Sequence, residues 1–442
     1  MSTHSEMADV IVVGGGPAGA CAAIDLAQGG ARVVLVEQGR FPRAKLCGEF
    51  ISPECLPHFA RLGVGGRMLS AGACAVTETV FYTRGGRRAA VPSEWFGAAG
   101  GAALGLSRAE MDGQLLKRAR EVGVEVLEET RATALVVEGG RVRGVCLKNG
   151  GAGKTERRAL VTLDATGRTR ALARMLEHGG SHEARRRGED EGRRPSEGGV
   201  GVNQRRVFAS EPSRSGPRRA PLVAFKAHLE GARGSAGACE IYFYRGGYGG
   251  ISPVENGLSN LCFIVSARDV RALGGDPERV LREVVQANAR ARETLKEARA
   301  CTRWLSVALD HFGRRDAAPA GGLLAVGDAA SFIDPFTGSG MLMALESGAL
   351  AADVLAQSLP ALRAADDASE PYAALAGIYG ARYAEHFSAR LRLCSWLRRA
   401  AFAPRAVTAL AVAALGASVG LRRVVARATR GSVRGDFRPR VG

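Results

Sequence analysis

The sequence has few aromatic residues and no closely spaced pair of cysteines. Phe, Trp and Tyr make up 6% of the 442 residues, and no basic stripe with interleaved aromatics accompanies the net charge of +17. Nucleic-acid binding is therefore disfavoured, and the net positive charge indicates instead an anionic membrane surface or an anionic cosubstrate as the binding partner. The nine cysteines include no C-x-x-C pair, which argues against a zinc site and for a reducing compartment. Since a charged-then-apolar leader is also missing, we expect a cytoplasmic protein.

A long hydrophobic run is missing as well. The segment 406–421 has no charged residue, but it is shorter than the ~20 apolar residues that a spanning helix needs. We expect this segment to pack on the protein. The alternative is a peripheral membrane contact through an apolar face with basic flanks, which would suit a lipid-like substrate. The flanking residues are Arg398, Arg399, Arg405, Arg422 and Arg423.

Residues Asp9 to Glu37 have the pattern of a site for an ADP-containing dinucleotide. A buried strand is followed by glycines at the G-x-G-x-x-G spacing, a helix, and a second strand that ends in an acid. Gly14 allows the tight turn, Gly16 lets the backbone approach a pyrophosphate, and Gly19 lets the helix pack close to the strand. Pyrophosphate sits on the free amides of a helix N-terminus, and Glu37 is placed to bind ribose hydroxyls.

Two further segments repeat the change from a buried strand to a glycine-containing loop. The first ends in Asp164-Ala165-Thr166-Gly167, and the second contains Gly327-Asp328 and ends at Gly340. Strand-like stretches lie between them, so we predict a cofactor domain that is interrupted twice by a substrate domain. The cofactor domain comprises 1–75, 106–175 and 303–360, and the substrate domain 76–105 and 176–302, with a basic flexible loop at 183–219. The C-terminal region, 361–442, is predicted to be helical.

The chain resembles the superfamily of flavoprotein hydroxylases, geranylgeranyl reductases and flavin halogenases, whose fold is that of p-hydroxybenzoate hydroxylase. The resemblance covers most of the chain up to about residue 360. It rests on the first glycine loop, the predicted helix at Arg108 with Ser107 as its cap and Glu110 as capping-box partner, the Asp164 segment and the Gly327-Asp328 segment. It implies an α/β fold: a Rossmann-like FAD-binding domain of the GR2 type, a mixed β-sheet substrate domain and a helical C-terminal segment.

The resemblance also implies roles for particular residues. Asp328 would bind the ribityl hydroxyls of FAD, Arg108 would meet the ribityl or pyrophosphate, and Asp164 would shape the turn beside the cofactor. The loop Asp334 to Gly340 would approach the isoalloxazine, with the following helix N-terminus facing its N1 and O2 side. The predicted cofactor-binding residues are Gly14, Gly16, Pro17, Ala18, Gly19, Glu37, Gln38, Arg43, Lys45, Cys47, Gly48, Arg108, Asp164, Gly167, Gly327, Asp328, Pro335, Gly338, Ser339, Gly340 and Met341.

The segment Arg43 to Glu49 matches the R-x-K-x-C-G motif of the reductase and hydroxylase branch. Cys47 could donate a proton or line the substrate pocket, and a small cysteine in a tight turn is the alternative reading. Where prenyl reductases carry Y-x-W-x-F-P and halogenases W-x-W-x-I-P, this chain has Tyr248 to Pro253 with neither central aromatic residue. The substitution should open space above the flavin. We place the chemistry near Cys47, Tyr248 and Pro335, and no metal is predicted.

The substrate pocket should be lined by Tyr242, Tyr244, Tyr248 and the strand 249–253, with Phe336 on the flavin side. No general base can be assigned, and His58, His228 and His311 are candidates in principle only. A single dinucleotide motif is visible, so NAD(P)H should dock transiently as a cosubstrate.

We therefore expect an NAD(P)H-using, FAD-dependent monooxygenase that transfers oxygen from O2 to a lipophilic aromatic or polyketide-like small molecule. A double-bond reductase of an isoprenoid or quinone is the alternative. A halogenase and a non-catalytic flavin-binding protein are disfavoured.

Overall fold

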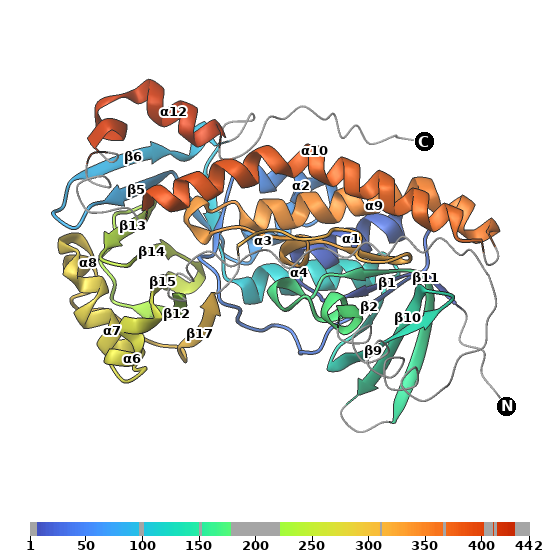
Figure 1. The fold of residues 1–442 in the computed structure, drawn as a ribbon. Coiled ribbons are helices and arrows are strands. Elements are labelled where there is room, and N and C mark those ends of the chain that lie inside the picture. The colour runs from blue at the N-terminus through green and yellow to red at the C-terminus, as the bar shows by residue number, and fades with distance from the viewer. Residues whose placement is uncertain are drawn as a thin grey trace, which may run out of the picture.

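Two large β-sheets lie at opposite ends of the molecule, and long helices run along its length (Figure 1). The computed structural model describes residues 7–96, 101–149, 153–177, 222–309, 312–365, 368–401, 410 and 413–428. The predicted flexible loop at 183–219, His311 and parts of the segment 406–421 lie outside these residues.

The first sheet has seven strands in the order β8-β2-β1-β11-β10-β9, with β19 paired to β11. Its central strands are parallel, and the register places Val13 beside Val36 on one side and beside Asp164 on the other. Strand β8 pairs parallel to β2 at one edge of this sheet. The strands are β1 (Ala8–Val13), β2 (Val33–Val36), β8 (Glu125–Leu127), β9 (Thr130–Glu138), β10 (Arg141–Asn149), β11 (Lys154–Asp164) and β19 (Leu323–Ala325).

Two helices pack on strands of this sheet, and a third, α9, packs on α1. They are α1 (Pro17–Gln28), α4 (Arg108–Glu121) and α9 (Gly340–Ala364). The Ser107 side chain caps α4 by accepting a hydrogen bond from the Glu110 amide (3.2 Å), as predicted. The Ser107 amide, however, donates to Glu255 Oε2 (2.9 Å), so a residue from the second sheet completes the cap in place of Glu110.

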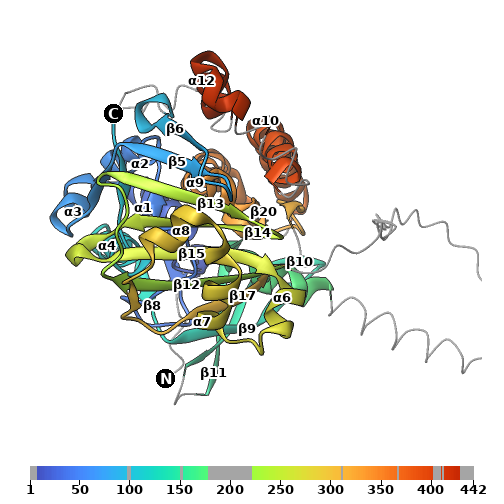
Figure 2. The same cartoon turned by 90° about the vertical axis from the view of Figure 1, so that its left-hand side faces the viewer.

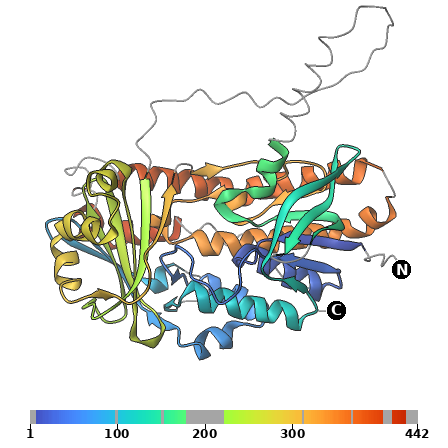
Figure 3. The ribbon, with the colours of Figure 1, turned by 90° about the horizontal axis from the view of Figure 1, so that it is seen from below.

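The second sheet has eight strands in the order β16-β12-β15-β14-β13-β5-β6, with β17 paired to β12. Figure 3 shows it at one end of the molecule, with the strands of the first sheet at the other. The predicted boundary at residue 303 assigns β17 to the cofactor domain, but β17 pairs with β12 of the second sheet. The strands are β5 (Glu78–Tyr82), β6 (Arg88–Pro92), β12 (Leu222–Glu230), β13 (Ala238–Tyr244), β14 (Gly247–Pro253), β15 (Ser259–Ser266), β16 (Arg299–Ala300) and β17 (Leu305–Leu309).

Short helices cover the outer face of the second sheet: α6 (Ala267–Ala272), α7 (Pro277–Glu283) and α8 (Ala289–Thr294). The segment 276–298 does not form one continuous helix, because Asn288 caps a new helix with its side chain. A three-stranded sheet, β3-β7-β4, contacts β14 through β4, and the helices α2 and α3 pack against α9 and α4, respectively. Their bounds are β3 (Phe50–Ile51), β4 (Cys74–Val76), β7 (Ala103–Gly105), α2 (Cys55–Arg61) and α3 (Gly65–Ser70).

The described part of the C-terminal region is mainly helical, as predicted. The long helix α10 (Glu370–Ala401) packs on α9, and α12 (Val419–Ala428) lies against β6 of the second sheet. Among the described residues one helix, α9, is long and apolar enough to cross a membrane, and 67% of its most apolar window is buried inside the structure. Its packing between α1 and α10 accounts for its apolar composition.

Candidate active site

A cavity of about 680 Å³ lies between the two large sheets. Most of the residues predicted to bind the cofactor line it, and so do Cys47, Tyr248 and Pro335. Three predicted residues do not: Gly19, Asp164 and Ser339 lie behind the wall. The predicted residues that line the cavity are Gly14, Gly16, Pro17, Ala18, Glu37, Gln38, Arg43, Lys45, Cys47, Gly48, Arg108, Gly167, Tyr248, Gly327, Asp328, Pro335, Gly338, Gly340 and Met341.

The first glycine loop brings α1 close to β1 and β11. A Cβ on Gly14, whose φ is +117°, would lie 2.2 Å from Ala165 O, and a Cβ on Gly19 would lie 2.0 Å from Gly14 O. Side chains are therefore excluded at both positions by backbone atoms that cannot move. Gly19 thus serves helix packing, which explains why it does not face the cavity.

Glu37 is held at one end of the cavity by three donors. The Gly15 amide donates to its Oε2 (2.9 Å), and the Gly39 amide (2.9 Å) and Arg43 Nη2 (2.8 Å) donate to its Oε1. The carboxylate is 3% exposed and keeps free lone pairs toward the cavity. This arrangement fits a ribose diol, and Arg43 acts there by fixing Glu37.

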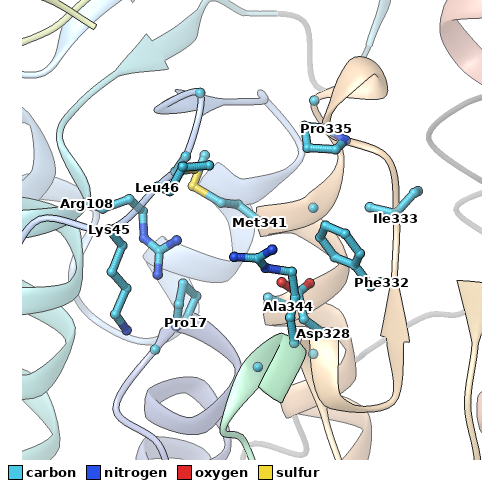
Figure 4. Close-up of a pocket in the computed structure, with 18 of the residues that line it drawn as sticks. Pro17, Lys45, Leu46, Arg108, Asp328, Phe332, Ile333, Pro335, Met341 and Ala344 are labelled. Atoms are coloured by element: carbon cyan, nitrogen blue, oxygen red, sulfur yellow. The ribbon is translucent and has the colours of Figure 1, made fainter. Parts of the chain in front are cut away.

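The N-terminus of α1 faces two cations across the cavity. A Cβ on Gly16 would meet nothing nearer than Lys45 Nζ (3.4 Å) and Arg108 Nη2 (3.8 Å). Figure 4 shows Lys45 and Arg108 on the same side of the cavity, next to Pro17. The first turn of α1 has no acid and no side-chain cap, so its amides and the helix dipole remain available for an anion.

Asp112 is the counter-ion that orients both cations. It is buried, accepts two hydrogen bonds from Arg108 (2.9 and 2.7 Å), and lies 3.4 Å from Lys45 Nζ. Burial lowers the pKa of Lys45, Asp112 opposes this effect, and Arg108 adds to it. With two cations and one carboxylate, the group carries an excess positive charge, which a pyrophosphate would neutralise.

Asp328 stands on the opposite wall, next to Phe332 and Ala344 in Figure 4. Burial raises the pKa of its carboxyl from 3.8 to about 6, although Arg168, Arg108 and Lys45 act in the opposite direction. Within the described part of the chain, no protein donor is hydrogen-bonded to this carboxyl. A half-buried acceptor that borders a cavity is suited to a ligand that brings its own hydroxyl groups. Together, Glu37, the α1 amides with their two cations, and Asp328 fit the adenosine ribose, pyrophosphate and ribityl chain of FAD.

Asp164 shapes the turn beside this site. Its Oδ1 accepts from the Thr166 amide (3.0 Å) and Thr166 Oγ1 (2.6 Å), and its Oδ2 accepts from the Ala173 amide (3.1 Å). The carboxylate is fully buried and lies outside the cavity. Asp164 therefore has a structural role, which is to fix this turn. Gly167, with a φ of +69°, is the predicted residue of this segment that lines the cavity.

The loop before α9 is fixed by Asp334. Its Oδ1 accepts from the Phe336 amide (3.0 Å) and from the Tyr248 hydroxyl, and its Oδ2 lies 2.9 Å from Arg398 Nε of α10. Burial and the neighbouring Asp334 raise the pKa of Tyr248 well above 10. The Tyr248 hydroxyl is therefore held by the Asp334 loop. The Tyr248 ring lines the cavity, and its centroid lies 5.3 Å from that of the Phe336 ring.

A buried charged cluster that the sequence did not reveal lies beside Cys47. Glu49, with a φ of +54°, pairs with Lys226 and with His228 Nε2 (2.6 Å) of β12, and also accepts from the Arg108 amide (2.8 Å). Burial alone raises the pKa of Glu49, but the hydrogen bond from His228 and the charge of Lys226 outweigh it and lower the pKa. The cluster joins the Cys47 segment to the second sheet.

The substrate side of the cavity is apolar. Its wall combines one face of β13 and β14 with the loop before α9 and the C-terminal helices. Arg422 is the only charged residue among the described residues of this wall. The main contributors are Phe81, Val91, Phe96, Cys239, Ile241, Phe243, Ile264, Val307, Leu309, Phe336, Leu397, Leu415, Arg422, Val425 and Ala426.

Two expectations about this wall are wrong. Tyr242 and Tyr244 point to the other face of the sheet, where they pack with the residues of α7 and α8. Cys239, Ile241 and Phe243 line the cavity in their place, one position out of step with the prediction. The missing aromatic at Gly250 also leaves no open space, because a Cβ there would meet Ile241 Cδ1 at 2.7 Å.

Comparison with known proteins agrees with this geometry. Residues 7–162 match the model of a family described as an FAD binding domain. A menaquinone reductase of Mycolicibacterium smegmatis is 27% identical over 79% of this chain and 76% of its own length. The flavin-dependent halogenase armH3 of Armillaria mellea is 34% identical, but over 27% of this chain and 24% of its own length.

A solved structure shares nearly the whole fold. A geranylgeranyl bacteriochlorophyll reductase-like protein from Thermoplasma acidophilum superposes with a TM-score of 0.71 at 20% identity, covering 95% of this chain and 96% of that one. This chain is an FAD-dependent oxidoreductase. Its fold is the predicted GR2 type, which the solved reductase-like structure shares. The fold and the FAD cofactor predicted from the sequence are thereby confirmed.

Proposed function

We propose that this oxidoreductase reduces a carbon–carbon double bond of a lipophilic substrate of the isoprenoid type, such as the side chain of a prenylated quinone. The apolar substrate wall is the observation that carries the proposal. An isolated double bond has no polar group for the protein to recognise, and it can be held only by contacts such as those of Phe81, Ile241 and Phe336. The similarity to the menaquinone reductase, which extends over most of both chains, supports the same assignment.

FAD, when bound, would carry the electron pair that NAD(P)H delivers while it docks transiently. The chain holds FAD through Glu37, the α1 N-terminus with Lys45 and Arg108, and Asp328. The apolar wall excludes water and orients the substrate. The double bond gains a hydride and a proton, so a proton donor must reach the same cavity.

We assign the proton to Cys47 Sγ. Cys47 lines the cavity, and its segment is held by hydrogen bonds from the second sheet: Lys226 Nζ donates to Lys45 O (3.3 Å) and Asn260 Nδ2 donates to Cys47 O (3.1 Å). Tyr248 is a positioning residue, because its hydroxyl holds Asp334. Pro335 begins the short helix that this carboxylate caps.

The hydroxylation of a lipophilic aromatic or polyketide-like compound, favoured at first from the sequence, is the second candidate. Its support is the replacement of both central aromatics of the reductase motif by Gly250 and Ser252. Such a reaction would consume O2. A phenolic substrate would require a polar partner at the reacting ring, and the Tyr248 hydroxyl is already committed to Asp334.

Anaerobic steady-state turnover tests the proposal. With NAD(P)H and a prenylated quinone, the reductase should oxidise NAD(P)H without O2, in proportion to the double bonds reduced. A Cys47→Ala variant should retain FAD and its reduction by NAD(P)H but lose about 100-fold or more in product formation, the usual contribution of a positioned acid. Cys146→Ala, on the far strand β10, is the matched control. Turnover that requires O2 would reject the reductase in favour of the hydroxylase.

A further inference from the structure

The ends of the two C-terminal helices present an apolar and basic surface. Of the nine large hydrophobic side chains that are exposed among the described residues, five lie between Trp396 and Val424. The sequence contains no Asp or Glu between Glu385 and Asp436. Figure 2 shows α10 and α12 next to each other along the outer edge of the molecule. We call this surface the C-terminal face, and it comprises Arg392, Trp396, Arg399, Leu421, Val424 and Arg427.

On α10 the exposed side chains follow one side of the helix, and on α12 Leu421, Val424 and Arg427 are exposed at helical spacing. On α10, Arg392, Trp396 and Arg399 recur at helical spacing, with Trp396 70% exposed. On α12, Val424 is 63% exposed and Arg427 follows it at the next turn. An indole flanked by arginines is the composition typical of a membrane–water interface.

The opposite side of α12 is already occupied. Arg422 Nη1 donates to Ala90 O of β6 (2.6 Å), and Ala426 is 5% exposed in a cluster with Val91 and Phe96. Val425 and Ala426 also form part of the cavity wall. The helix is therefore docked on the protein by one side, and no other described residue covers its second apolar side. The same helix separates the cavity from the C-terminal face.

We propose that the C-terminal face docks on an anionic lipid bilayer and that α12 forms the boundary across which a lipophilic substrate passes into the cavity. Exposed apolar residues insert at the headgroup level, and each nearby arginine adds attraction to anionic lipid. A second copy of this chain is a poorer occupant, because a two-fold contact would oppose arginines with arginines. The proposal does not depend on which reaction the flavin site performs.

Co-sedimentation of the FAD-bound full chain with vesicles tests this proposal. The protein should sediment with vesicles that contain phosphatidylglycerol, remain in solution with pure phosphatidylcholine vesicles, and be released by salt. Val424→Asp and Trp396→Ala should each weaken binding by about tenfold or more, since they remove inserted surface. Leu69→Asp on α3, where Leu69 is 62% exposed, is the matched control and should bind like the parent.

FAD content and turnover of a detergent-solubilised substrate show whether the variants are folded, and both should be unchanged. Equal binding by the Val424→Asp and Leu69→Asp proteins would overturn the proposal. It would also fail if the parent bound neither kind of vesicle, or if Val424→Asp dissociated a dimer and left vesicle binding unaffected.

Discussion

Replacing Asp328 by Asn should stabilise the FAD-free protein and weaken its affinity for FAD. Burial raises the pKa of this carboxyl from 3.8 to about 6. The native state therefore disfavours the charged form, and the free energy of unfolding contains a penalty that develops as the pH rises from about 4 and is complete above about 6. A displacement of this size corresponds to at most about 3 kcal/mol, less whatever water in the cavity screens.

FAD binding should respond in the opposite direction. Hydrogen bonds from ribityl hydroxyls to a charged acceptor contribute about 1.5–3 kcal/mol, so the Asn variant should bind FAD about 10- to 100-fold more weakly. Urea unfolding of the deflavinated proteins gives the stability, and quenching of FAD fluorescence gives the affinity. Glu385→Gln, which removes an exposed acid on α10, controls for the change in net charge.

The pH series provides the sharpest check. The stability gain of Asp328→Asn over the parent should be small near pH 4 and reach its maximum above pH 6. A gain that is independent of pH, or unchanged stability together with unchanged FAD affinity, would refute the assignment of Asp328 as a desolvated acceptor for the cofactor.

Three further predictions concern the packing around the site. Lys226→Met should lower the free energy of unfolding, measured in urea, by about 3–5 kcal/mol because it removes the cation that pairs with the buried Glu49 carboxylate. Adding Glu49→Gln should restore part of this stability. Because the pKa of Glu49 is lowered, its contribution is present above about pH 4.5 and lost below it, so Glu49→Gln alone should flatten the fall in stability on acidification. Gly348→Ala should cost about 1–3 kcal/mol and reduce FAD content, since its Cβ would lie 2.4 Å from Ala18 O, whereas Gly380→Ala on α10 has open space and should be neutral or stabilising. Thermal unfolding measures the stability of the two glycine variants, and the ratio of flavin to protein absorbance measures their FAD content. Equal values for Gly348→Ala and Gly380→Ala would contradict the last prediction.

The cofactor end could be predicted because its constraints are local. Gly14, Gly16 and Glu37 follow one another within one strand, loop and strand, and the turn chemistry is visible in the sequence itself. The Ser107 cap is local in the same way. Its second partner, Glu255, comes from 148 positions away, and no periodicity indicates such a contact.

The substrate end was predicted less well because its strands lack a polar side. Six of the seven residues of β13 are buried, since the cavity wall covers one face and α7 and α8 cover the other. Without an alternation of polar and apolar residues, the sequence does not show which face carries the pocket, and Tyr242 was placed on the wrong one. The pairing of Glu49 with Lys226, 177 positions apart, was missed for want of any local pattern.

The reductase assignment is tested most directly by the mass of the product that the full chain forms from a prenylated quinone with NAD(P)H under isotopically labelled O2. We expect a product that has gained a pair of hydrogen atoms at a side-chain double bond and contains no labelled oxygen. A product that carries labelled oxygen and retains all its double bonds would contradict the reductase assignment.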